Sequence, residues 1–214
     1  FYPDGIWTTP NDAALKKDIE LSLAAGFNGA RLHQKVFEER FLYWADMMGY
    51  LVWGESASWG LDYCRDGMPH RNFLAEWREI ILRDRNHPSI IAWTPLNETR
   101  EFHRPEAHRR LHIDAYKLCK ALDPSRPVND TSGYIHHITD IYSVHTYTQD
   151  PEDLDKELSP TGGDAVFRRF SEVSSAYAGQ PYVVDEFGGI KWNPSFMSGG
   201  EEGNTSDSWG YGRA

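Results

Sequence analysis

The sequence predicts an α/β fold in which parallel strands alternate with helices. Three observations predict it: short apolar runs of strand length recur, longer stretches with apolar residues at helical spacing separate most of them, and glycines mark several boundaries. No Gly-rich phosphate loop follows the first apolar run, so the dinucleotide-binding open sheet lacks its fingerprint. We therefore expect a (β/α)8 barrel, with a doubly wound open sheet as the other parallel arrangement.

The first expected helix begins at residues 9–12, which read Thr-Pro-Asn-Asp. This segment combines a hydroxyl cap, a proline in the first turn and an acidic residue beside the positive end of the helix dipole. Apolar residues then recur at helical spacing until Gly26, which favours a helix end. Residues 27–32 follow as the first expected strand.

The alternation of helix and strand continues along the chain. A helix over 39–48 ends before Gly49, and the apolar run 50–53 is typical of a buried parallel strand. The later elements are expected as helices over 73–85, 106–122 and 165–178, and as strands over 89–93, 127–129, 141–145 and 182–186.

Chain length limits the number of domains. A chain of 214 residues is of the size of one domain, so residues 1–214 are expected to form most of one barrel domain. A complete barrel takes roughly 250 residues and eight strands. Because six strands are expected, we predict that the first and last strands are missing from this chain and that the barrel is incomplete. Residues 198–214, rich in Gly, Ser and acidic side chains, are expected to be a loop or a flexible end.

Composition excludes several classes of partner. The formal net charge of -10 and the pI near 5.3 disfavour nucleic acid, because phosphate binding depends on clustered Lys and Arg. No run of about 18 apolar residues occurs, so no membrane span is expected. The two cysteines, Cys64 and Cys119, form neither a C-x-x-C motif nor a disulfide framework, and the compartment stays undetermined. No cofactor is expected.

Acidic residues follow three of the expected strands. Glu55, Glu98 and Glu186 stand at strand ends, and in a parallel barrel all carboxyl ends of the strands meet on one face. Hydrolysis of a glycosidic bond requires one carboxylic acid to protonate the leaving oxygen and one carboxylate to attack or to activate water. Glu98 and Glu186 fit such a pair. For any one of these glutamates alone, a helix cap or a surface ion pair is the favoured interpretation.

Flanking motifs favour the catalytic interpretation. Residues 83–98, which read RDRNHPSIIAWTPLNE, closely resemble the acid/base signature of glycoside hydrolase family 2, the β-galactosidase and β-glucuronidase family. Residues 27–31, 46–53 and 185–188 resemble further strand segments of that family. The resemblance implies a retaining β-glycoside hydrolase, β-galactosidase-like, with Glu98 as general acid/base and Glu186 as nucleophile. A retaining pair predicts carboxyl groups about 5 to 5.5 Å apart.

The family match also implies substrate contacts and partners. Arg31 would bind the nucleophile, Asn97 the sugar 2-hydroxyl, and Tyr147 would lie near the nucleophile. A carbohydrate is the expected substrate, and accessory β-sandwich domains are expected in the parent protein. Gln34 stands where many members have histidine, and Gly54 replaces the acidic residue of a common Asp-Glu pair. These departures leave the sugar open.

Other side chains are weaker candidates. His33 and His145 at strand ends, and Trp192, are expected to contact substrate. His108 and His112 lie four apart on an expected helix, but without an H-E-x-x-H motif a solvated face is favoured and no metal site is expected. Two alternatives remain. One is an inactive carbohydrate-binding or scaffold module derived from a glycosidase. The other is a metal-dependent barrel hydrolase, and the absence of clustered metal ligands at the expected strand ends counts against it.

Overall fold

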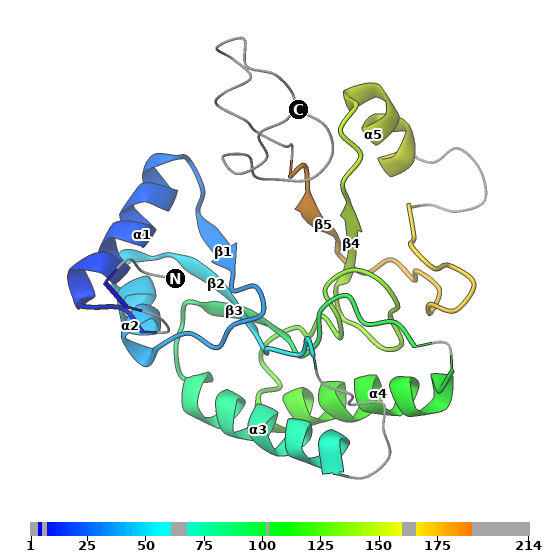
Figure 1. Cartoon of the computed structure of the whole chain (residues 1–214), viewed down its shortest axis with the longest axis horizontal. Helices are drawn as coiled ribbons and strands as arrows, with labels where there is room; N and C mark the ends of the chain where they lie inside the picture. Colours follow the sequence, from blue (N-terminus) through cyan, green and yellow to red (C-terminus); the bar gives the residue numbers. More distant parts are fainter. Residues whose placement is uncertain (1–3, 6–7, 61–67, 102, 160–165, 190–214) are drawn as a thin grey trace.

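Helices and parallel strands alternate along the chain, as the sequence predicts (Figure 1). The computed structural model describes residues 4–5, 8–60, 68–101, 103–159 and 166–189. In order, the elements are α1 (Asp12–Ala24), β1 (Gly29–Arg31), α2 (Glu39–Met48), β2 (Leu51–Glu55), α3 (Met68–Asp84), β3 (Ile90–Thr94), α4 (Pro105–Leu122), β4 (Tyr142–Thr146), α5 (Pro151–Leu158) and β5 (Tyr182–Phe187). No helix of the described segments is long and apolar enough to cross a membrane.

All strand pairs are parallel. β1, β2 and β3 form one sheet in that order, and β4 pairs with β5 in a second. The expectation of a strand over 127–129 is wrong. This segment forms only an isolated parallel bridge, between Val128 and Trp93 of β3. Pro127 has no amide hydrogen, and the Val128 amide donates to the Asp140 side chain at 3.0 Å instead of to a strand. The carboxyl ends of the described strands therefore face one side.

The two sheets enclose a common interior. Among them, β1 pairs only with β2 and β5 only with β4, so β1 and β5 are the outermost strands of the two sheets. A cavity of about 220 Å³ is lined by residues of β1, β2, β3 and β5, which places these strands around a common interior. Whether the remaining strands of a barrel lie outside this chain stays a prediction.

The helix expected over 165–178 is wrong, because its described residues, 166–178, form turns and bends. The helix of this region is α5, which lies earlier in the chain. Asp150 caps it by accepting from the backbone amides of Glu152 and Asp153 at 2.9 and 3.1 Å, and Pro151 occupies the first turn. The Asp-Pro pair was the sequence signal for this helix.

Helices α3 and α4 lie side by side and pack against the first sheet (Figure 1). Trp77 of α3 is fully buried and meets Trp93 of β3 edge to face, with ring centroids 5.7 Å apart. The Trp93 indole donates to Asp123 at 2.9 Å, and the Trp77 indole donates to the Cys119 thiol at 3.1 Å. Gly54 of β2 leaves room for the Trp93 ring, because a Cβ atom there would lie 2.7 Å from it.

The expectation that His108 and His112 lie on a solvated face is wrong. Both are buried, with 1% and 0% of their surface exposed. They belong to the same stripe of α4 as Leu111, Ala115 and Cys119, which are also buried. The spacing of these five residues is that of a single helix face, so the apolar members place both imidazoles toward the core.

We expect Trp77→Ala to lower the free energy of unfolding by about 3–5 kcal/mol, because it leaves a cavity between α3 and β3 that the surrounding side chains cannot fill. Urea titration of the full chain measures the change. Met47→Ala is the control, since Met47 lies on α2 with 64% of its surface exposed, and it should change stability by less than about 0.5 kcal/mol. Equal effects of the two substitutions would contradict the assigned core.

Candidate active site

Arg31, at the end of β1, connects the ends of several strands. Its Nε lies 2.8 Å from a carboxylate oxygen of Glu55, and its Nη2 lies 2.5 Å from Oε1 of Glu186. The same Nη2 donates to Oδ1 of Asn97 at 3.2 Å. Only 10% of the Arg31 side chain is exposed. A largely buried guanidinium requires such acceptors, because an unpaired buried charge is costly.

Glu186 has a second donor besides Arg31. The Tyr147 hydroxyl donates to its Oε2, and Nδ1 of His145 lies 3.5 Å from the same oxygen. Burial raises the pKa of Glu186, but the Tyr147 hydroxyl, the His145 charge and the Arg31 guanidinium together outweigh burial and lower the pKa below its usual value. Glu186 is therefore a carboxylate at neutral pH.

Glu98 follows β3 with a left-handed backbone, at φ +47°. Its amide donates to the carbonyl of Ser132 at 2.9 Å, next to the parallel bridge between Asn97 and Ser132. This conformation is uncommon for a residue with a side chain and costs on the order of 1–3 kcal/mol, so the surrounding contacts must hold it. It directs the carboxylate to His145, whose Nδ1 lies 2.8 Å from Oε1 of Glu98.

His145 of β4 lies between carboxylates, with its side chain fully buried. Nδ1 faces Glu98 and Glu186, while Nε2 lies 3.3 Å from Oδ1 of Asp185 and 2.8 Å from the Ser132 hydroxyl. Carboxylates accept hydrogen bonds, so both ring nitrogens carry protons. Burial lowers the pKa of His145, but the bonds to Asp185 and Glu98 outweigh it and raise the pKa to about 9.

Glu55 is the most deeply buried carboxyl of the site. Its Oε1 accepts the backbone amide of Gln34 at 2.9 Å, and its side chain is fully buried. Burial raises the pKa of Glu55 to about 7, although Arg31 and the Gln34 amide lower it in part. Glu55 thus supports Arg31 from the end of β2.

The two expected catalytic carboxylates are close together. One oxygen of Glu98, one oxygen of Glu186 and a ring nitrogen of His145 all lie within 4.8 Å of one another. Two facing carboxyl groups at this separation, one paired with Arg31 and the other with His145, can serve different roles in acid/base and nucleophilic chemistry.

The structure brings together all but one of the predicted site residues. Trp192 lies outside the described residues. His33 is at the rim, about half exposed, with Nδ1 3.4 Å from Oε1 of Glu186. The residues that come together are Arg31, His33, Asn97, Glu98, His145, Tyr147 and Glu186.

Sequence reasoning missed a rim aromatic and its support. Trp59 is 58% exposed, meets the His33 ring edge to face at 5.5 Å, and donates from its indole to the Asn97 carbonyl at 3.3 Å. Gln34 accepts the amides of Ser58 and Trp59 through one oxygen, at 2.9 Å each. Gln34, which stands where many proteins of the resembled family have histidine, thus holds the loop that carries Trp59. Asp185 and Ser132 were also missed, because their role appears only through His145.

Comparison with known proteins gives a consistent result. The family model described as "Glycosyl hydrolases family 2, TIM barrel domain" matches residues 9–189. β-Glucuronidase of Canis lupus familiaris is 34% identical over 118 residues, which cover 53% of this chain and 18% of that protein. β-Galactosidase of Alteromonas mediterranea is 30% identical over 129 residues, covering 58% and 12%. The chain spans less than a fifth of the length of these relatives.

Solved structures show the same likeness. A family 2 β-galacturonidase from Eisenbergiella tayi, bound to galacturonate, matches with a TM-score of 0.63 and 25% identity, over 83% of this chain and 32% of that one. A β-glucuronidase from an uncultured Clostridium species matches with a TM-score of 0.67 at 20% identity, over 86% and 34%, which shows the fold.

The charge on His145 predicts a pH dependence of stability. The His145 pKa of about 9 lies above the 6.5 of a free histidine. The stability that the charged ring contributes is therefore fully present below pH 6.5 and is lost as the pH rises through about 9. We expect the free energy of unfolding to fall by up to about 3 kcal/mol between pH 7 and 9.5, at 1.36 kcal/mol per pKa unit.

The measurement is urea unfolding of the full chain across this range, with His145→Asn as the comparison. The variant has no ionisable group at this position and should show a flatter profile. The raised pKa of Glu55, about 7, also contributes to stability. This contribution is complete below about pH 4.5 and is lost as the pH rises to about 7, so its loss precedes that of the His145 contribution. Parallel profiles above pH 7 for wild type and variant would rule out a charged His145.

Proposed function

This chain belongs to glycosyl hydrolase family 2, and we propose that it carries the site of a retaining β-glycoside hydrolase, with Glu186 as nucleophile and Glu98 as general acid/base. The observation that carries the proposal is the proximity of the two carboxylates, because one oxygen of Glu98 lies within 4.8 Å of one oxygen of Glu186. Retaining enzymes need such a close pair, with carboxyl groups roughly 5–5.5 Å apart.

Two displacements complete the reaction. In the first, Glu186 attacks the anomeric carbon, the bond to the leaving oxygen breaks, and that oxygen takes a proton from Glu98. In the second, Glu98 removes a proton from water, which attacks the anomeric carbon and releases Glu186. The lowered pKa of Glu186 supports its role, since only the ionised carboxylate can attack.

His145 supports the proton transfer by Glu98. The Nδ1 proton points at Oε1 of Glu98 over 2.8 Å, which fixes the direction of the carboxyl group. We propose that His145 is a positioning residue, which orients Glu98 toward the leaving oxygen.

Asn97 supplies the strongest indication of where sugar binds. Its Oδ1 accepts from Arg31, which fixes the other end of the amide as the nitrogen. That Nδ2 is buried and has no hydrogen-bond partner within the described part of the chain. A buried donor left without a partner costs free energy, and a sugar 2-hydroxyl beside the two carboxylates would satisfy it. The exposed Trp59 ring offers an apolar surface next to it.

The two glutamates should differ in their effects on activity. The intact protein is first tested on a panel of aryl β-glycosides: a galactoside, a glucuronide, a galacturonide, a glucoside and a mannoside. On the substrate that it hydrolyses, Glu186→Gln should abolish turnover, because no glycosyl-enzyme can form. With an activated aryl leaving group, Glu98→Gln should give a burst followed by slow turnover, since the intermediate forms but its hydrolysis lacks a base. Stopped-flow release of the aryl alcohol and intact-mass spectrometry measure both.

The outcome that would overturn the assignment is undiminished steady-state turnover of Glu98→Gln, or a glycosyl-enzyme in Glu186→Gln. An intact protein that hydrolyses nothing in the panel but binds one of the sugars would favour the inactive carbohydrate-binding module.

Asn97→Ala should lower kcat/KM for a substrate with a 2-hydroxyl by about 10- to 100-fold, the equivalent of about 1.4–2.8 kcal/mol for one hydrogen bond in a site with charged neighbours. The matched test is the 2-deoxy analogue of the same glycoside. On this substrate the wild type and the variant should have similar kcat/KM values. An equal loss on both substrates would show that Asn97 acts by positioning Arg31 and not by binding the hydroxyl.

A further inference from the structure

Three imidazoles gather outside the candidate active site. His108 and His112 lie one turn apart on the buried face of α4, and His137 comes from the segment before β4. Nε2 of His112 lies 3.2 Å from Nε2 of His108, and Nδ1 of His108 lies 2.9 Å from Nε2 of His137. One ring nitrogen from each can be chosen so that all three lie within 4.8 Å of one another.

The arrangement around His112 fixes the direction of its lone pair. Its Nδ1 lies 2.8 Å from Oδ2 of Asp130, a fully buried carboxylate, and therefore donates to it. Nε2 is then the acceptor and faces His108. A histidine held by a carboxylate on one nitrogen and offering the other is the usual arrangement around a metal-binding imidazole.

Asp130 is held in its ionised form from the opposite side. His136 directs Nδ1 to Oδ1 of Asp130 at 2.6 Å and Nε2 to the Ser143 carbonyl at 2.7 Å. Both of these partners accept hydrogen bonds, so both His136 nitrogens carry protons and the ring is a cation. Asp130 thus has a partner on the side away from the three histidines.

Without an ion, the cluster is a chain of hydrogen bonds. His137 donates to His108, His108 donates to His112, and His112 donates to Asp130. To become ligands, His108 and His137 must carry their protons on the ring nitrogens that do not bind the ion. Because His108 faces a neighbour with each of its nitrogens, one of these ring contacts must open as the ion enters. No proton has to leave the protein, and the Thr99 hydroxyl, 2.9 Å from His112 Nε2, can turn away.

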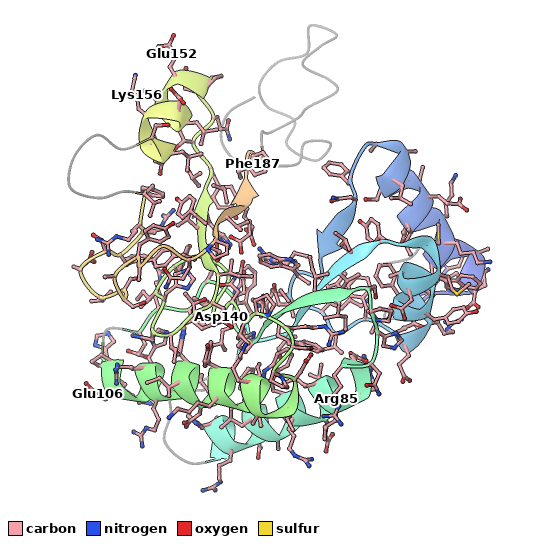
Figure 2. The ribbon with its side chains drawn as sticks, turned by 180° about the vertical axis from the view of Figure 1, so that it is seen from behind. Arg85, Glu106, Asp140, Glu152, Lys156 and Phe187 are labelled. Carbon is pink, nitrogen blue, oxygen red and sulfur yellow. The ribbon has the colours of Figure 1, made fainter. Side chains whose placement is uncertain are left out.

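An entry path reaches the cluster. A cavity of about 480 Å³ is lined by His108 and His137 and by the carboxylates Glu101 and Glu106. Figure 2 places Glu106 at the N-terminal end of α4, below the segment that follows α5, and Ser174 and Ser175 of that segment line the same cavity. Arg109 is the cation among the lining residues, on the helix turn next to Glu106.

We propose that His108, His112 and His137 form a binding site for one divalent transition-metal ion of the Zn²⁺ and Co²⁺ class. Three neutral imidazoles are the ligand set that these ions prefer over Mg²⁺ or Ca²⁺, and the cavity leaves a fourth position for water or for Glu101 or Glu106. The expectation of no metal site assumed solvated rings, and their burial removes that assumption.

The ion would join two elements that support the candidate active site. It would join α4 to residues 134–138, and this segment follows Gly133, where a Cβ atom would lie 2.7 Å from the His145 ring. An ion that binds only the folded chain stabilises it in proportion to the logarithm of its concentration over its Kd. We therefore assign the ion a structural role, separate from hydrolysis.

Co²⁺ is the probe for the test, because its visible absorption reports on nitrogen ligands and geometry. We expect the chelator-treated full chain to bind one equivalent of Co²⁺ with absorption bands of a low-coordinate site, to lose them when Zn²⁺ is added, and to unfold at a higher temperature with either ion. His137→Ala and His108→Asn should each weaken Co²⁺ binding at least about 100-fold. His70→Ala, which removes a histidine of α3 paired with Asp114, should bind as the wild type does.

Circular dichroism of each variant establishes that it is folded before titration. His137 is only partly buried and lies outside the helices, so its substitution is the one that the fold should tolerate best. The proposal is overturned if wild-type protein shows no Co²⁺ bands at millimolar Co²⁺, or if both cluster variants, folded, bind as His70→Ala does. These readouts are independent of glycoside hydrolysis.

Discussion

The candidate active site depends on one buried cation. Arg31 contacts carboxylates or amides from the ends of β2, β3 and β5, and its own position at the end of β1 follows from the parallel register with β2. Each contact partner alone would be a buried polar group with a large desolvation cost. Together they place negative charge and acceptor oxygens around the guanidinium, so the geometry of the strand ends and the charge of the site depend on the same interaction.

A second cation balances the remaining negative charge. His145 of β4 contacts Glu98, Asp185 and Glu186. The two cations together lower the pKa of Glu186 and so keep it ionised. Two carboxyl groups a few ångströms apart would otherwise repel each other and share a proton, which would blur their roles.

The sequence predicted the elements that have regular periodicity and the residues that belong to long motifs. β2, β3 and β5 fell within two residues of their expected bounds, and α4 within one, because apolar periodicity and flanking glycines or motifs define them. Segment 127–129 and helix 165–178 failed, because a side chain of Asp140 replaced strand pairing in the first and turns replaced the helix in the second. His145 was predicted at the site but not its charge. That charge follows from Asp185 and Glu98, which become neighbours of His145 only in three dimensions.

The contact between Arg31 and Glu186 joins residues 155 positions apart. During synthesis the arginine emerges long before its carboxylate partner, so the N-terminal half of this domain must exist for a time with an exposed guanidinium and incomplete strand ends. Closing so long a loop is slow compared with forming α1 to β3, whose pairings are local. The cluster of charged residues at the strand ends can therefore order only after β5 has been synthesised.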